Sequence, residues 1–378
     1  MHTLLKEHEV TPRQSEIMKH FCQYLGRSVP DKFQILPPNY VAVLHHWRVL
    51  HLISASLQVE RCMFWKNFFT GPFFQKPQSD QEEDTASMEG MHPNECQEVE
   101  LPMAVDSHFH PDRLSEKTSI PWAKDITKLL YAGPVEPNHL VRLGGSVAVF
   151  CDPSTYPTIS QLNVLPGNIV VALGLHPHHA RKSRRLLDEA VERLQRLLRS
   201  ERVTAFGEIG IDHSDPESEW AYQSELLRRL TPLVKQEHVL EIHCRGMKDE
   251  CGTEAYLLLL HHLKKRISRM QRINLHYFTG YPYLLERWLE QFPETWFGFT
   301  SMVKNFDRNH RDSSNLVKEY RLLLETDAPY FTLEGQPLSS PNQIYRTAEI
   351  VAELRQVSAD HILSVTAKNA KTLYRIKD

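Results

Sequence analysis

Downstream of residue 100 the sequence alternates short apolar segments with amphipathic ones, and this alternation limits the fold more than any other feature. Eight segments rich in Val, Ile and Phe have the length and composition of β-strands. They are Pro102–Asp106, Ser146–Cys151, Ile169–Leu173, Val203–Phe206, Val239–Ile242, Ile273–Leu275, Trp296–Phe299 and Leu322–Leu324. Amphipathic helices are expected in several gaps, at Ser183–Leu198, Trp220–Lys235, Glu254–Ile267 and Tyr283–Gln291. Strands alternating with helices form parallel sheets, and eight repeats in about 220 residues predict an α/β fold, a (β/α)8 barrel of the TIM type.

One gap departs from the repeat. Asp152–Asn168 contains three prolines and no convincing amphipathic helix, so a seven-stranded or distorted barrel remains an alternative. Two further helices, Gln343–Arg355 and Ala359–Arg375, are expected to close the barrel domain.

An acidic segment divides the chain. Residues 79–100 hold eight acidic residues and neither Lys nor Arg, which is typical of a solvated linker. Residues 101–378 would form the barrel. Residues 1–78 carry nine basic against five acidic residues, helical apolar spacing and the aromatic segment Phe64–Phe74. We expect a small helical region whose aromatic residues form its own core or dock on the main domain; a dedicated site for a ligand or a protein partner is the alternative.

Composition narrows the cellular context. The six cysteines are scattered with no CxxC pair, which favours reduced thiols in a cytoplasmic or nuclear protein. The most apolar stretch, Val41–Val59, is interrupted by three histidines and an arginine, so we expect no membrane span. The net charge of −3 gives no overall attraction to nucleic acid, so a polyanionic substrate would need local cations.

Histidines and carboxylates stand at the carboxyl ends of five expected strands, where barrel enzymes carry their active sites. One zinc ion needs only three protein ligands, and this set offers six. The six are His108, His110, Glu208, His243, His276 and Asp327. Such a set suits two divalent ions about 3.5–4 Å apart with a bridging carboxylate, an arrangement that clamps a phosphate during hydrolysis.

The same strand ends resemble the motifs of the TatD family of metal-dependent deoxyribonucleases, within the metallo-dependent hydrolase superfamily. The matching segments are Asp106-Ser-His108-Phe-His110, Gly174-Leu-His176-Pro-His178, Gly207-Glu208-Ile-Gly210-Ile-Asp212, His243-Cys-Arg245, Leu275-His276-Tyr-Phe-Thr-Gly280 and Leu324-Glu325-Thr-Asp327-Ala-Pro329-Tyr330. The resemblance covers about residues 101–378 and implies a TIM-type barrel, phosphodiester hydrolysis in DNA and divalent metal ions, commonly magnesium.

The resemblance also implies roles for the six residues. His108 and His110 would hold one ion and His243 and His276 the other. Glu208 would bridge the two ions as part of the catalytic centre. Asp327 would complete the first site and accept the proton of the attacking water.

Four neighbouring residues complete the expected site. Arg245 and His176 could contact a substrate phosphate; a structural ion pair for Arg245 and a loop-ordering role for His176 are the alternatives. We expect Asp106 and Asp212 to orient ligating histidines rather than to bind metal. Four imidazoles favour Zn²⁺ or Mn²⁺ on ligand softness, whereas the family resemblance favours Mg²⁺.

The chain departs from the family pattern at three positions that bear on substrate preference. His213 replaces an aromatic residue, Gly246 replaces an acid and Tyr277 replaces the usual cysteine. The leading hypothesis is a two-metal nuclease that acts on DNA, with RNA left open, from a strand end. The alternative is a barrel amidohydrolase acting on a small amide, ester or lactone, and a third hypothesis is a non-catalytic binding module.

Overall fold

The computed structural model describes residues 100–247 and 252–377, which belong to one compact unit spanning residues 99–378. The expected helical region 1–78 and, apart from Glu100, the expected linker lie outside the described residues.

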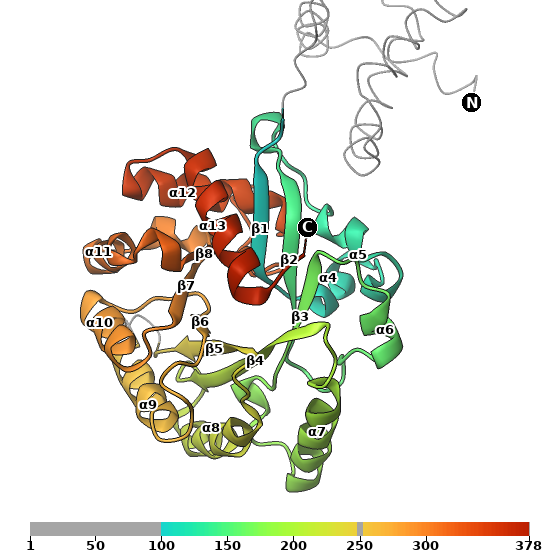
Figure 1. The fold of residues 1–378 in the computed structure, drawn as a ribbon, viewed down its shortest axis with the longest axis vertical. Helices are drawn as coiled ribbons and strands as arrows, with labels where there is room; N and C mark the ends of the chain where they lie inside the picture. Colours follow the sequence, from blue (N-terminus) through green and yellow to red (C-terminus); the bar gives the residue numbers. More distant parts are fainter. Residues whose placement is uncertain (1–99, 248–251, 378) are drawn as a thin grey trace, which may run out of the picture. The chain divides into compact units, whose positions relative to one another are not determined.

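Eight parallel strands form the centre of this unit in the order of the sequence (Figure 1). They are β1 (Met103–Phe109), β2 (Arg142–Phe150), β3 (Ile169–Leu173), β4 (Val203–Asp212), β5 (Val239–Arg245), β6 (Ile273–Leu275), β7 (Thr295–Phe299) and β8 (Leu322–Leu324). The predicted barrel is confirmed, with a seam between β1 and β8. There the strands meet through a single bridge between Phe109 and Ala328, and Asp327 N donates to His108 O at 3.0 Å.

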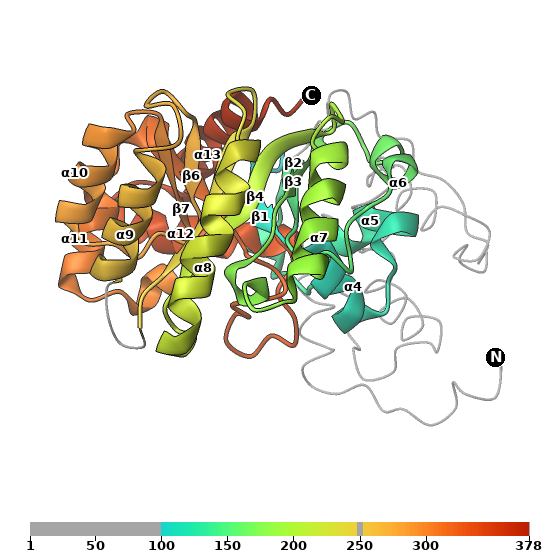
Figure 2. The same cartoon turned by 90° about the horizontal axis from the view of Figure 1, so that it is seen from below.

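Helices follow the strands and mostly lie on the outer side of the ring, whereas the last helix covers the amino-terminal end of the barrel (Figures 1 and 2). They are α4 (Pro111–Thr118), α5 (Trp122–Leu130), α6 (Ile159–Asn163), α7 (Arg184–Leu197), α8 (Glu217–Leu230), α9 (Thr253–Leu263), α10 (Pro282–Gln291), α11 (Arg308–Leu316), α12 (Ile344–Arg355) and α13 (Ala359–Tyr374). The proline-rich gap holds only the five residues of α6, as its sequence indicated. Among helices of the described residues, none is long and apolar enough to cross a lipid bilayer.

The inside of the barrel is apolar at the amino-terminal ends of its strands. Val105, Val239 and Leu323 belong to a buried cluster that also includes Leu373 and Tyr374 of α13. The helix α13 therefore packs against the amino-terminal end of the barrel interior, and polar side chains occupy the carboxyl end.

Candidate metal centre

All six predicted metal ligands meet at the carboxyl end of the barrel. They come from β1, β4, β5, β6 and β8 or from the one to three residues that follow, and each is at most 5% exposed. They are His108, His110, Glu208, His243, His276 and Asp327. Buried charged groups at this density need partners of opposite charge, which divalent cations would supply.

A first group of ligand atoms surrounds His110. Its Nε2 atom lies 3.2 Å from His108 Nε2, 3.3 Å from Asp327 Oδ1 and 3.7 Å from Glu208 Oε2. Ligands about 2.0–2.1 Å from a tetrahedral zinc ion are about 3.3 Å from one another, so these separations fit a bound ion.

A second group surrounds the other oxygen of Glu208. Glu208 Oε1 lies 2.8 Å from His243 Nδ1 and 3.8 Å from His276 Nε2. The second oxygen of Asp327, Oδ2, lies 3.7 Å from His276 Nε2. Glu208 thus presents one oxygen to each group of imidazoles.

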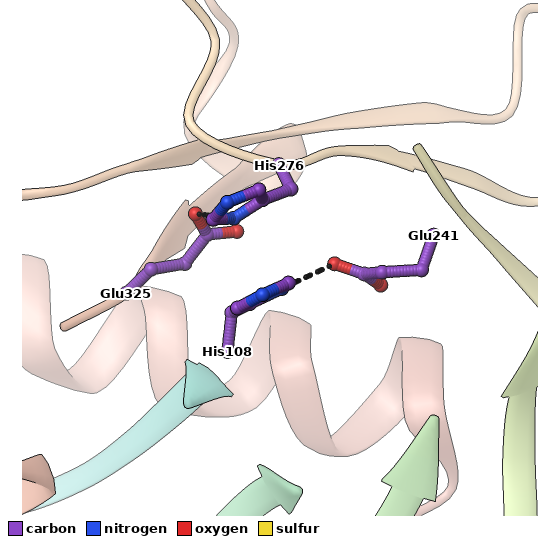
Figure 3. Close-up of side chains that lie close together, drawn as sticks. All are labelled: His108, Glu241, His276 and Glu325. Atoms are coloured by element: carbon purple, nitrogen blue, oxygen red, sulfur yellow. Dashed lines mark hydrogen bonds and ion pairs between the residues drawn. The ribbon is translucent and has the colours of Figure 1, made fainter. Parts of the chain in front are cut away.

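Hydrogen bonds on the far sides of two rings free the nitrogens that face the centre. His108 Nδ1 lies 3.1 Å from Glu241 Oε1, and His276 Nδ1 lies 2.9 Å from Glu325 Oε2 (Figure 3). When Nδ1 carries the proton, Nε2 keeps a lone pair for a metal ion.

The side chain of Asp327 also indicates a bound cation. Its Oδ1 atom is buried and makes no hydrogen bond within the described part of the chain. A buried acceptor without a donor is costly unless a cation satisfies it, so the side chains of the centre fit divalent metal.

Glu241 and Glu325 were not singled out from the sequence. Each precedes a predicted ligand by two residues, so both point into the barrel one layer beneath the centre. Asn274 joins them, donating to Glu241 Oε1 at 2.7 Å and to Glu325 Oε1 at 3.0 Å. The sequence did offer one signal: a polar residue stands two positions before each of His243, His276 and Asp327.

The buried charges of Glu241 and Glu325, beneath the centre, are unfavourable when no cation is near. Burial raises the pKa of Glu241 to about 8, and the nearby charge of Glu325 acts in the same direction. Burial opposes protonation of His276, but the charges of Glu325 and Asp327 overcome it and raise the pKa of His276 to about 9.

Asp106 contacts the backbone of one predicted ligand, His108. It contacts no imidazole among the described residues; it accepts hydrogen bonds from the backbone of His108 and from Thr326 N and Oγ1, at 2.5–3.2 Å. Its carboxylate faces β8 across the seam, so it ties β1 to the segment that carries Asp327. Burial raises the pKa of Asp106 to about 7, although the bonds from Thr326 lower it.

Asp212 contacts one of the predicted ligands, His243. Its Oδ2 atom lies 2.9 Å from His243 Nε2, which leaves His243 Nδ1 facing Glu208. Burial of Asp212 opposes its ionisation, but the hydrogen bond to His243 holds its pKa well below the ordinary value.

His176 and Arg245 lie at the edge of the centre. A ring nitrogen of His176 is within 4.8 Å of ligand atoms of Glu208 and His243, and His176 Nδ1 accepts the backbone N–H of His178 at 3.2 Å. The Arg245 side chain is 43% exposed, and its Nη1 lies 3.8 Å from Asp212 Oδ2. This separation is too long for a hydrogen bond, so within the described part of the chain the guanidinium donates none to Asp212.

Two glycines make room for this arrangement. A Cβ atom at Gly210 would overlap the His243 carbonyl, so glycine allows β4 to lie against β5. A Cβ atom at Gly298 of β7 would overlap the Glu325 carboxylate. Both positions therefore require the smallest residue.

Comparisons with known proteins agree with this geometry. The family model described as TatD related DNase matches residues 105–375. The 3′–5′ RNA nuclease TATDN2 of Homo sapiens is 28% identical over 72% of this chain, which covers 35% of that relative's length. The 3′–5′ ssDNA/RNA exonuclease TatD of Edwardsiella piscicida is 31% identical over 54% of this chain, and the match covers 76% of that relative's length.

A solved structure shares the fold. The crystal structure of YJJV, a TatD homologue from Escherichia coli K12, matches with a TM-score of 0.58 and 24% identity. The match covers 72% of this chain and 98% of that one.

Proposed function

This chain belongs to the TatD family of metallo-dependent hydrolases, and we propose from this premise that it is a nuclease. It would hydrolyse phosphodiester bonds in DNA or RNA from a strand end, using two divalent metal ions. The names of two relatives, an RNA nuclease and an ssDNA/RNA exonuclease, support nucleic acid as substrate, and for this reason the proposal includes RNA as well as DNA.

One observation carries the proposal. Glu208 and Asp327 each present their two oxygens to two different groups of imidazoles, as bridging carboxylates between paired ions do. His108 and His110 would hold one ion, and His243 and His276 the other. When bound, the ions would neutralise phosphate charge and make a water molecule more acidic.

The side chains around the centre would bind substrate and move a proton. Asp327 is the proposed acceptor of the proton from the attacking water, since it is buried at the junction of both groups. His176 and Arg245 would hold substrate phosphate oxygens, the arginine through its guanidinium. Asp212 would hold the His243 ring in the orientation that turns Nδ1 toward Glu208.

Metal identity is a separate proposal. Four imidazole ligands favour Zn²⁺ or Mn²⁺ over Mg²⁺ on softness, whereas the carboxylates accept all three. We therefore expect activity to depend on which of these three ions is supplied.

The test is digestion of end-labelled single- and double-stranded DNA and RNA by the full chain. Reactions with chelator, Mg²⁺, Mn²⁺ or Zn²⁺ should show shortening from a labelled end only when metal is present. Asp327→Asn serves as the matched inactive control. Absence of cleavage with every ion, together with turnover of an amide or lactone panel, would replace the nuclease by the amidohydrolase hypothesis.

A further inference from the structure

Two aromatic side chains stand next to the metal centre with no role in holding metal. Tyr277 directly follows His276, and Phe331 lies four residues after Asp327. Their ring centroids are 4.6 Å apart at an angle of 52°, and both side chains are half-buried. We call Tyr277 and Phe331 the rim pair.

The backbone of Tyr277 is hydrogen-bonded to a residue of the centre. Tyr277 N donates to Glu325 Oε2 at 3.0 Å, and Glu325 also binds His276. The Tyr277 ring centroid lies 6.3 Å from the ring centroid of His276, so the ring stands beside a proposed metal ligand.

The backbone at both positions is unusual for large side chains. Tyr277 has φ of 44° and Phe331 has φ of 49°, in the left-handed region that bulky residues rarely adopt. Such conformations persist where the surroundings impose them and gather at ligand-binding sites. Packing alone would not require two neighbouring aromatic residues in left-handed conformations beside the metal centre.

The chemistry of the surroundings identifies an occupant. A phosphate held by Arg245 and by the ions that Glu208 and Asp327 would bind would place the attached nucleoside beside the rim pair. Aromatic rings bind unpaired bases by stacking, which is insensitive to sequence because every base has a flat face. A base inside a duplex is already covered by its neighbours.

We propose that the rim pair is a stacking site for an unpaired nucleobase next to the scissile phosphate, and that it selects single-stranded ends. The proposal rests on the nuclease function proposed above and names the residues that set its substrate class. A second tyrosine, Tyr330, has its ring 5.6 Å from the His110 ring and is not part of the proposed stacking site.

The test compares short single-stranded oligonucleotides whose end nucleosides either carry a base or have tetrahydrofuran in its place. Stacking of one base is worth about 1–3 kcal/mol, so the full chain should favour the base-bearing ends about 5- to 150-fold in kcat/KM. The ratio should fall to about 1 in Tyr277→Leu and remain in Tyr277→Phe, which keeps the ring.

A second readout requires no hydrolysis. Terminal 2-aminopurine loses fluorescence when it stacks, and stopped-flow mixing reads this before cleavage. Quenching should occur with the unmodified chain and Tyr277→Phe and be lost in Tyr277→Leu and Phe331→Leu. The matched control is Tyr320→Leu, since Tyr320 is 64% exposed and precedes β8 at the other end of the barrel. Melting curves identify any variant that fails to fold.

The outcomes separate the two proposals. Quenching that depends on Tyr277, without hydrolysis of any nucleic acid, supports the stacking site and removes the nuclease function. Hydrolysis with an unchanged ratio and unchanged quenching in folded Tyr277→Leu overturns the stacking site and leaves the nuclease standing.

Discussion

Glu208 and Asp327 divide their carboxylate oxygens between the same two imidazoles. Glu208 Oε2 and Asp327 Oδ1 lie 3.7 and 3.3 Å from His110 Nε2, and the other two oxygens lie 3.8 and 3.7 Å from His276 Nε2. The two acids thus resemble each other in geometry, although we propose different roles for them. Amide substitutions can separate these roles because they keep shape and remove charge.

We expect Glu208→Gln to lose bound metal, because a neutral amide cannot offset the charge of two neighbouring dications. Asp327→Asn should retain most metal through its carbonyl oxygen. Its single-turnover rate should fall by about 10²–10⁴, the usual contribution of a positioned general base. Elemental analysis of purified protein and rapid-quench kinetics measure the two effects.

Each variant is the control for the other. Full metal occupancy in Glu208→Gln would refute the bridge. Near-normal hydrolysis by Asp327→Asn would refute its role as the base.

The sequence predicted the strands well where they are short apolar runs, and β3, β6 and β8 have the predicted bounds. It ended the fourth strand at Phe206, whereas β4 continues to Asp212. Gly207 and Gly210 look like strand breakers in isolation. In the barrel they let β4 lie against β5, and only the neighbouring strand reveals that need.

The proposed ligands could be selected from the sequence, whereas two of the carboxylates that contact them, Glu241 and Glu325, could not. Metal ligands are recognisable because their types and strand-end positions repeat around the barrel. Glu241 and Glu325 stand one layer lower, where a single sequence does not indicate which acid meets which imidazole. Their partners, His108 and His276, are more than 45 residues away and come near only when the barrel closes.

We expect Glu241→Gln to weaken metal binding by about 10- to 100-fold, the usual effect of losing a carboxylate that orients a ligating histidine. The neutral amide no longer favours the Nδ1–H form of His108, so Nε2 becomes a poorer ligand. Metal titration against a chromophoric chelator measures the change. Glu290→Gln, exposed on α10, should bind metal normally, and an equally unaffected Glu241→Gln would mean that Glu241 only fills the barrel.

Removal of metal should lower the melting temperature. Six carboxylates near the centre are at most 4% exposed, and cations would stabilise their charged forms. They are Asp106, Glu208, Asp212, Glu241, Glu325 and Asp327. One ion supplied at 100 times its Kd adds about 2.7 kcal/mol, which corresponds to about 5–10 °C for a barrel of this size.

Calorimetry with chelator and after metal is restored measures this shift. Glu208→Gln is the control, because a variant without metal should melt at one temperature in both conditions. An unchanged melting temperature of the unmodified chain would show that the centre binds no ion with useful affinity.

The barrel should also fold without the residues that precede it. A fragment from Glu98 to Asp378 keeps every described strand and helix, including α13, which packs against the amino-terminal end of the barrel interior. The removed boundary is rich in acids and poor in large apolar residues, as domain linkers are. We expect a cooperative melting transition and metal-dependent hydrolysis within about threefold of the full chain, measured by circular dichroism and single-turnover kinetics. The same fragment with Glu208→Gln excludes contaminating nuclease. An insoluble fragment would instead mean that the aromatic segment Phe64–Phe74 belongs to the core of the barrel.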